Sequence, residues 1–74
     1  MSKLSTLKVG DKARISTVDC EGALRDRLIS LGVARGEAFE VIGKSAMGVT
    51  FEIMVGGNRV ALRRNEAELI GIEL

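Results

Sequence analysis

The chain has 74 residues, of which 46% are hydrophobic, so it is long enough for one small core and too apolar for a disordered chain. We expect a single domain over residues 1–74. Eleven basic and ten acidic side chains leave a net charge of +1, which argues against a nucleic-acid-binding protein because such proteins carry a basic excess. A net charge this close to zero permits self-association into a homo-oligomer.

One cysteine, Cys20, and no histidine are present. An intramolecular disulfide cannot form, which fits a reducing cytosol, and neither a Ser-His-Asp nor a Cys-His catalytic arrangement can be built. The first residues lack the apolar run of a signal peptide, and no segment approaches the ~20 apolar residues that cross a bilayer. We therefore expect a cytoplasmic protein that has no catalytic residues, no cofactor and no direct membrane insertion.

The first predicted elements are a strand over residues 12–18 and a short amphipathic helix over residues 24–31. The strand shows period-two alternation, and the helix repeats leucine at i, i+4 and i+7. Gly32 follows where a helix C-terminus favours positive φ. Because a helix this short does not persist alone in water, strands must hold it by packing. The face expected to enter the core carries Leu24, Leu28 and Leu31.

Three further strands are predicted after the helix, at residues 38–43, 49–55 and 59–63. Residues 44–48 form a loop, and the Gly-Gly-Asn sequence at residues 56–58 is typical of a short hairpin connection. The alternation directs one apolar row inward, made of Phe39, Val41, Val49, Phe51, Ile53, Val55, Val60 and Leu62.

The C-terminal part predicts a helical turn and a last strand. Asn65 and Glu68 have the spacing of a capping box, which would open one turn before a strand at residues 69–74. The order of elements is typical of a mainly β protein, a small SH3-like barrel of five strands. One short helix is inserted after the first strand, and a helical turn precedes the last. We expect closure of this barrel to hide the sheet edges.

Four sequence blocks occur at a characteristic spacing: residues 7–13 (LKVGDKA), 27–33 (RLISLGV), 57–63 (GNRVALR) and 66–70 (EAELI). Together they resemble the family of ferrous iron transport protein A, the small cytosolic companion of the bacterial membrane iron permease with a GTPase domain. The resemblance implies an SH3-like barrel that binds the cytosolic part of that permease and modulates it, without enzymatic activity. The same fold resembles the C-terminal domain of iron-dependent repressors.

Binding to a partner is therefore the expected activity, and its contacts are predicted around the helix and on exposed methionines. The leucines belong first to the core, and a groove open to a partner is the alternative. Arg27 belongs to the family pattern and is expected to form an ion pair or a partner contact, and exposed methionines suit adaptable binding surfaces. The candidate contacts are Arg25, Arg27, Leu28, Leu31, Arg35, Met47, Met54 and Arg63.

Other functions remain open at this point. A small nucleic-acid-binding barrel would need aromatic stacking positions, and only Phe39 and Phe51 are available. A stand-alone regulatory domain related to the iron-dependent repressors would bind iron or a proline-rich peptide, and the peptide mode also needs aromatic walls. No metal site is predicted, because the carboxylates near Cys20 and in the last turn lack histidine partners.

Overall fold

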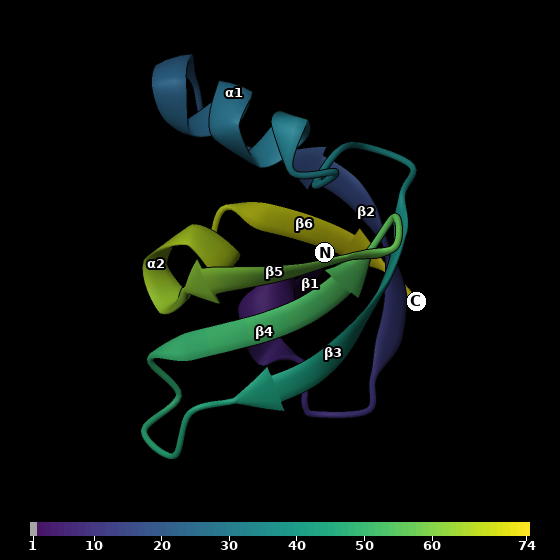
Figure 1. Cartoon of the computed structure of the whole chain (residues 1–74), viewed down its shortest axis with the longest axis vertical. Coiled ribbons are helices and arrows are strands. Elements are labelled where there is room, and N and C mark those ends of the chain that lie inside the picture. Colours follow the sequence, from purple (N-terminus) through teal and green to yellow (C-terminus); the bar gives the residue numbers. More distant parts are fainter. Residues whose placement is uncertain (1) are drawn as a thin grey trace.

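The computed structural model describes residues 2–74. Six antiparallel strands form one sheet in the order β1-β6-β2-β3-β4-β5, and they wrap around a common core with α1 projecting at one end (Figure 1). None of the helices in residues 2–74 is long and apolar enough to cross a membrane. The elements are β1 (Ser2–Lys3), η1 (Leu4–Thr6), β2 (Lys12–Val18), α1 (Gly22–Ser30), β3 (Ala38–Lys44), β4 (Thr50–Val55), β5 (Asn58–Arg63), α2 (Arg64–Ala67) and β6 (Ile70–Glu73).

The expected mainly β class is confirmed, but the sheet has one strand more than the five predicted. The additional strand is β1, which pairs with β6 by placing Ser2 opposite Ile72. Two residues are too few to show alternation, so the pattern could not reveal this strand. The chain then turns through η1, which buries Leu4 and leads to the buried Leu7. β1 and β5 are the two ends of the sheet and do not pair with each other within the described chain, so the prediction that closure hides the edges is wrong.

The predicted inward row of apolar side chains forms the core, with one exception. Val49 is 57% exposed, because β4 begins one residue later, at Thr50, and Val49 lies in the preceding turn. The aliphatic core also includes residues from β2, α1, α2 and β6. Its fully enclosed large side chains are Phe51, Leu4, Ile15, Leu28, Ile53, Leu62, Ile70, Val33, Val41 and Val55.

The C-terminus of α1 is fixed by a glycine cap, as predicted for Gly32. Gly32 has φ +96°, a conformation that glycine adopts without steric cost. Its N–H donates to Ile29 O (3.0 Å), and the N–H of Val33 donates to Leu28 O (2.9 Å), which is the pattern of a Schellman motif. Because Leu28 and Val33 are both fully buried, this turn directs the chain into the core.

Only part of the predicted leucine face of α1 enters the core. Leu28 is 0% exposed and Leu24 packs on the core while partly buried, but Leu31 is 37% exposed. The helix begins at Gly22, two residues earlier than predicted, and ends at Ser30. Since the tight cap follows directly, Val33 rather than Leu31 occupies the core beside the helix end.

The capping interaction of α2 is displaced by two residues from its predicted position. The helix begins at Arg64, and the N–H of Arg63 donates to Glu66 Oε1 (2.9 Å). The prediction that Asn65 and Glu68 form the capping box is therefore wrong. Glu66 is the carboxylate three residues after the true cap position, so it accepts the free backbone N–H.

The contrast between Leu28 and Leu31 predicts two different effects on stability. Leu28→Ala should lower the free energy of unfolding by about 2–5 kcal/mol, because it leaves a cavity where α1 meets the sheet. Leu31→Ala should change it by less than about 0.5 kcal/mol, because that side chain is partly solvated. Urea unfolding of both variants measures the difference. Equal losses in the two variants would contradict Leu28 as the residue that anchors α1.

Candidate functional site

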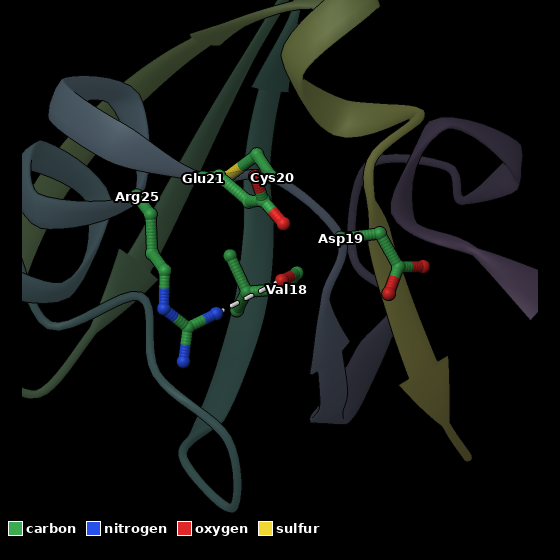
Figure 2. Close-up of a pocket in the computed structure, with 5 residues that line it drawn as sticks. All are labelled: Val18, Asp19, Cys20, Glu21 and Arg25. Carbon is green, nitrogen blue, oxygen red and sulfur yellow. Dashed lines mark hydrogen bonds between the residues drawn. The ribbon is translucent and has the colours of Figure 1, made fainter.

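A groove lies between β2 and α1, and it brings together two of the predicted contact residues. Arg25 lies on α1, and Arg35 follows the helix cap. The groove encloses about 230 Å³ and is lined by Ser16, Thr17, Val18, Asp19, Arg25, Ile29 and Arg35. We name it the β2–α1 groove. It continues into an open hollow lined by Val18, Asp19, Cys20, Glu21 and Arg25 (Figure 2).

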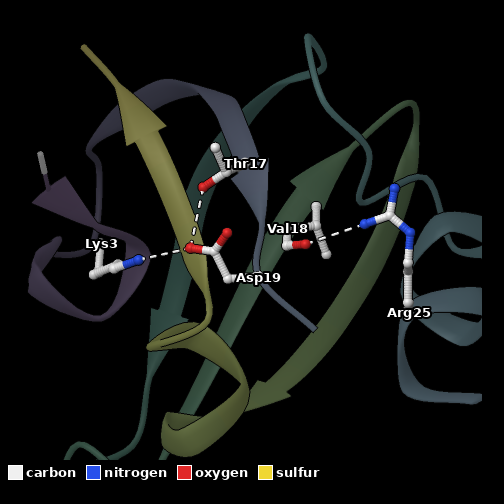
Figure 3. A network of polar contacts seen from close by, with 5 residues as sticks. All are labelled: Lys3, Thr17, Val18, Asp19 and Arg25. Atoms are coloured by element: carbon white, nitrogen blue, oxygen red, sulfur yellow. Dashed lines mark hydrogen bonds and ion pairs between the residues drawn. The ribbon is translucent and has the colours of Figure 1, made fainter. Parts of the chain in front are cut away.

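The segment that follows β2 is held from both sides of the groove. Arg25 Nη1 on α1 donates to Val18 O (3.1 Å). On the other side, Asp19 Oδ2 accepts hydrogen bonds from Lys3 Nζ (2.9 Å) and Thr17 Oγ1 (3.4 Å), as Figure 3 shows. The backbone N–H of Asp19 donates to Leu69 O (2.7 Å), so β6 supports the same segment. These contacts connect α1 to β1, β2 and β6.

The charge of the groove is set by its arginines. The hydrogen bond from Lys3 lowers the pKa of Asp19 below its ordinary value of 3.8, with help from the charge of Lys3 and from Thr17, although desolvation opposes it. The Asp19 carboxylate points away from Arg25 (Figure 2) and is paired with Lys3. Arg25 and Arg35 therefore leave the middle of the groove positively charged, while Glu21 lies at the far end.

Cys20 is a free, partly buried thiol between Asp19 and Glu21. Within residues 2–74, no three side chains of histidine, cysteine, aspartate or glutamate come close enough together to hold a metal ion. The contacts available in this hollow are hydrogen bonds, charges and apolar surface, which are the contacts of a binding surface.

Arg27 and Arg63 meet in a second hollow, on the other flank of α1. Arg27 Nη2 and Glu66 Oε2 form an ion pair at 2.6 Å, in which the Glu66 side chain is only 14% exposed. The pair ties α1 to α2 and agrees with the expectation that Arg27 forms an ion pair, but its partner could not be predicted because the two residues are 39 positions apart. We name this the α1–α2 hollow. It is lined by Arg27, Thr50, Ala61, Leu62, Arg63, Asn65 and Glu66.

The remaining candidate contacts are scattered. Leu28 is wholly buried, so its prediction as a partner contact is corrected: it belongs to the core. Leu31 is 37% exposed at the helix end, Met54 is 37% exposed on β4, and Met47 is 83% exposed in the β3–β4 turn. The prediction missed Ile29, which is 41% exposed in the β2–α1 groove. Its position off the leucine stripe was the signal that it faces outward.

The comparisons with known proteins agree on one protein family. The family model of the FeoA domain matches residues 2–74. The FeoA protein from Chlorobium tepidum is 40% identical, with a TM-score of 0.92 over 99% of this chain and 70% of that chain. FeoA from Stenotrophomonas maltophilia, solved with zinc, is 28% identical, with a TM-score of 0.84 over 99% of this chain and 91% of that chain. It is described as a prokaryotic SH3 domain protein.

The fold extends to regulators of transcription. A manganese-dependent transcriptional repressor is 16% identical, with a TM-score of 0.87 over 97% of this chain and 35% of that chain, and this similarity concerns the fold alone. No curated protein matches the sequence.

The Lys3–Asp19 pair makes a prediction for titration. In NMR-monitored titration, the pKa of Asp19 should lie below 3.8, and Lys3→Met should move it back toward that value. Because the folded-state pKa is lowered, the pair stabilises the fold above the unfolded pKa, and this contribution is lost as pH falls through the folded pKa. Lys8→Met is the control and should leave Asp19 unchanged. An Asp19 pKa that does not respond to Lys3→Met would exclude the pair in solution.

The Arg27–Glu66 pair predicts a measurable coupling energy. A double-mutant cycle of Arg27→Ala and Glu66→Ala should give about 0.5–1 kcal/mol in unfolding experiments, because one partner is largely buried. The matched control is the more exposed Arg59–Glu52 pair, whose atoms lie 3.8 Å apart and which should show almost none. Equal coupling in both cycles would mean that the shorter pair does not tie α1 to α2.

Proposed function

The chain belongs to the FeoA domain family, and on this basis we propose that it is a non-enzymatic adaptor of bacterial ferrous iron uptake. It acts in the cytoplasm, where it binds the cytosolic part of the ferrous iron permease that carries a GTPase domain. The Stenotrophomonas maltophilia relative, described as a candidate ferrous iron transport activating factor, supports a role of this kind.

The β2–α1 groove is the structural feature on which the proposal of partner binding rests. Ile29 provides an exposed apolar floor, and Arg25 and Arg35 provide positive charge beside it. Since Asp19 is already paired with Lys3, little negative charge opposes these arginines. Such a surface fits a partner segment that combines an apolar side chain with acidic ones.

The adaptor acts by differential binding. A protein that binds one conformation of the permease more tightly than another shifts the permease toward that conformation. The coupling is reciprocal, so a nucleotide that favours the same conformation must also increase the affinity for the adaptor. The groove supplies contacts for this effect, and the GTPase domain supplies the chemistry.

Binding to the permease is the test of this function. The purified chain should bind the full-length permease of the same organism in nanodiscs, with an affinity that differs between GTP and GDP and is measured with and without ferrous iron. Arg35→Glu should weaken binding by about ten-fold, because it reverses the charge of the groove. Lys8→Glu is the matched control, since it makes the same change in net charge between η1 and β2, outside the lining of the groove, and should leave permease binding intact.

Two results would contradict the proposal at different levels. Absence of binding under every nucleotide and iron condition would overturn the adaptor function itself. Saturable binding that Arg35→Glu leaves unchanged would keep the adaptor function and exclude the groove as its contact. Circular dichroism of each variant shows that lost binding does not reflect lost folding.

A further inference from the structure

The outer edge of β5 presents backbone groups that do not bond to the rest of the sheet. β5 is the last strand in the sheet order, and its neighbour is β4. The N–H of Arg64 donates to Val49 O (2.7 Å) in register with the β4–β5 ladder. Bonded and non-bonded pairs alternate in an antiparallel ladder, so positions 58, 60 and 62 bond to β4. Arg59 and Ala61 therefore direct their N–H and C=O groups away from it.

These edge groups are available for a further strand. Within residues 2–74, the N–H and C=O groups of Arg59 and Ala61 take part in no other backbone hydrogen bond, whereas Glu66 Oε1 accepts the N–H of Arg63 (2.9 Å). Ala61 is exposed and lines the α1–α2 hollow. The register of β5 is regular over all six residues, without the bulge or proline that blocks strand addition at many sheet edges.

The side chains of this edge favour an acidic partner. Arg59 and Arg63 flank Ala61 on the exposed face of β5. Arg27 lines the hollow beside it, but its charge is already paired with Glu66, so Arg59 and Arg63 supply the positive charge of this edge. The contact of Arg59 with Glu52 is 3.8 Å long and exposed on both sides, so it is a weak pair. A second copy added antiparallel about Ala61 would place Arg59 opposite Arg63, and like charges directly opposite each other destabilise a strand pair.

We propose that β5 is a strand-addition site for an extended segment of a partner protein that carries acidic residues at positions i and i+4 and an apolar residue at i+2. Antiparallel addition sets the acidic side chains opposite Arg59 and Arg63. The apolar side chain then lies over Ala61, whose methyl group leaves room in the α1–α2 hollow. Backbone hydrogen bonds supply affinity and the side chains select the partner. This surface is distinct from the β2–α1 groove and does not depend on binding to the permease.

A pair of synthetic peptides tests the proposal on the full chain. The probe is acetyl-Thr-Glu-Thr-Val-Thr-Glu-Thr-amide, and its control replaces both glutamates with lysine. In ¹⁵N NMR titrations, the acidic peptide should shift the Arg59 and Ala61 amides and slow their hydrogen exchange. The affinity for the lysine peptide should be lower by about ten-fold or more, because its lysines bring like charges to the edge.

Two sets of variants separate backbone from side-chain recognition. Ala61→Pro removes one edge N–H without touching the ladder to β4, a position where edge strands tolerate proline, and it should weaken the acidic peptide about ten-fold. Ala61→Val keeps the N–H and is the matched control. If Ala61→Pro fails to fold, the double variant Arg59→Glu/Arg63→Glu tests the proposal instead. It reverses the charge of the edge, so it should bind the lysine peptide more tightly than the acidic peptide.

Three results would overturn the proposal: equal affinities for the two peptides, amide shifts confined to residues outside β5, or no binding of the acidic peptide. Protection of the β5 amides that grows with protein concentration, without any peptide, would identify a second copy of the chain as the occupant and would also refute an acidic partner segment.

Discussion

The packing of Leu28 into the core is the contact on which both candidate surfaces depend. A helix of nine residues is too short to persist by its own hydrogen bonds, so α1 exists because the sheet holds it. Leu28 supplies the fully buried contact, and the Gly32 cap joins it to the buried Val33 by a 2.9 Å hydrogen bond. Loss of this anchor would displace the side chains of α1 together, so binding depends on the stability of this one junction.

Two arginines fix how α1 lies on that anchor. Arg25 donates to Val18 O on one flank, and Arg27 pairs with Glu66 on the other. Residues two apart on a helix do not share a face, so this spacing is what lets a single short helix contact β2 and α2 at once. The same two side chains border the β2–α1 groove and the α1–α2 hollow. The position of the helix and the charge of both surfaces are therefore set by the same residues.

Regular local patterns could be predicted from the sequence, and contacts between distant segments could not. The inward rows of β3, β4 and β5 follow from period two, and Gly32 follows from the need for positive φ at a helix end. The N-terminal Leu4 and Leu7 reach the core through a two-residue strand and a single 3₁₀ turn, which are too short to produce a pattern.

Long-range polar contacts explain most of the remaining differences. Glu66 accepts hydrogen bonds from both Arg27 and the Arg63 backbone, and the bond from Arg27 depends on where α1 lies. A capping pattern read locally could not contain that information. The outward direction of Ile29 follows from its position off the leucine stripe, but its place in the β2–α1 groove depends on how α1 lies against β2.

The two edges of the sheet are treated unequally, and charge explains how the longer one can stay open. β1 has two residues, which offers little backbone for another strand to pair with, whereas β5 has six in regular register. A net charge of +1 gives little overall repulsion between copies of the chain, so two uncharged β5 edges would pair with each other. Arg59 and Arg63 repel a second copy of β5 locally while leaving the backbone of Ala61 accessible. Charge placed at two positions of one strand thus excludes the chain's own copy and admits an acidic segment, a distinction that net charge alone cannot make.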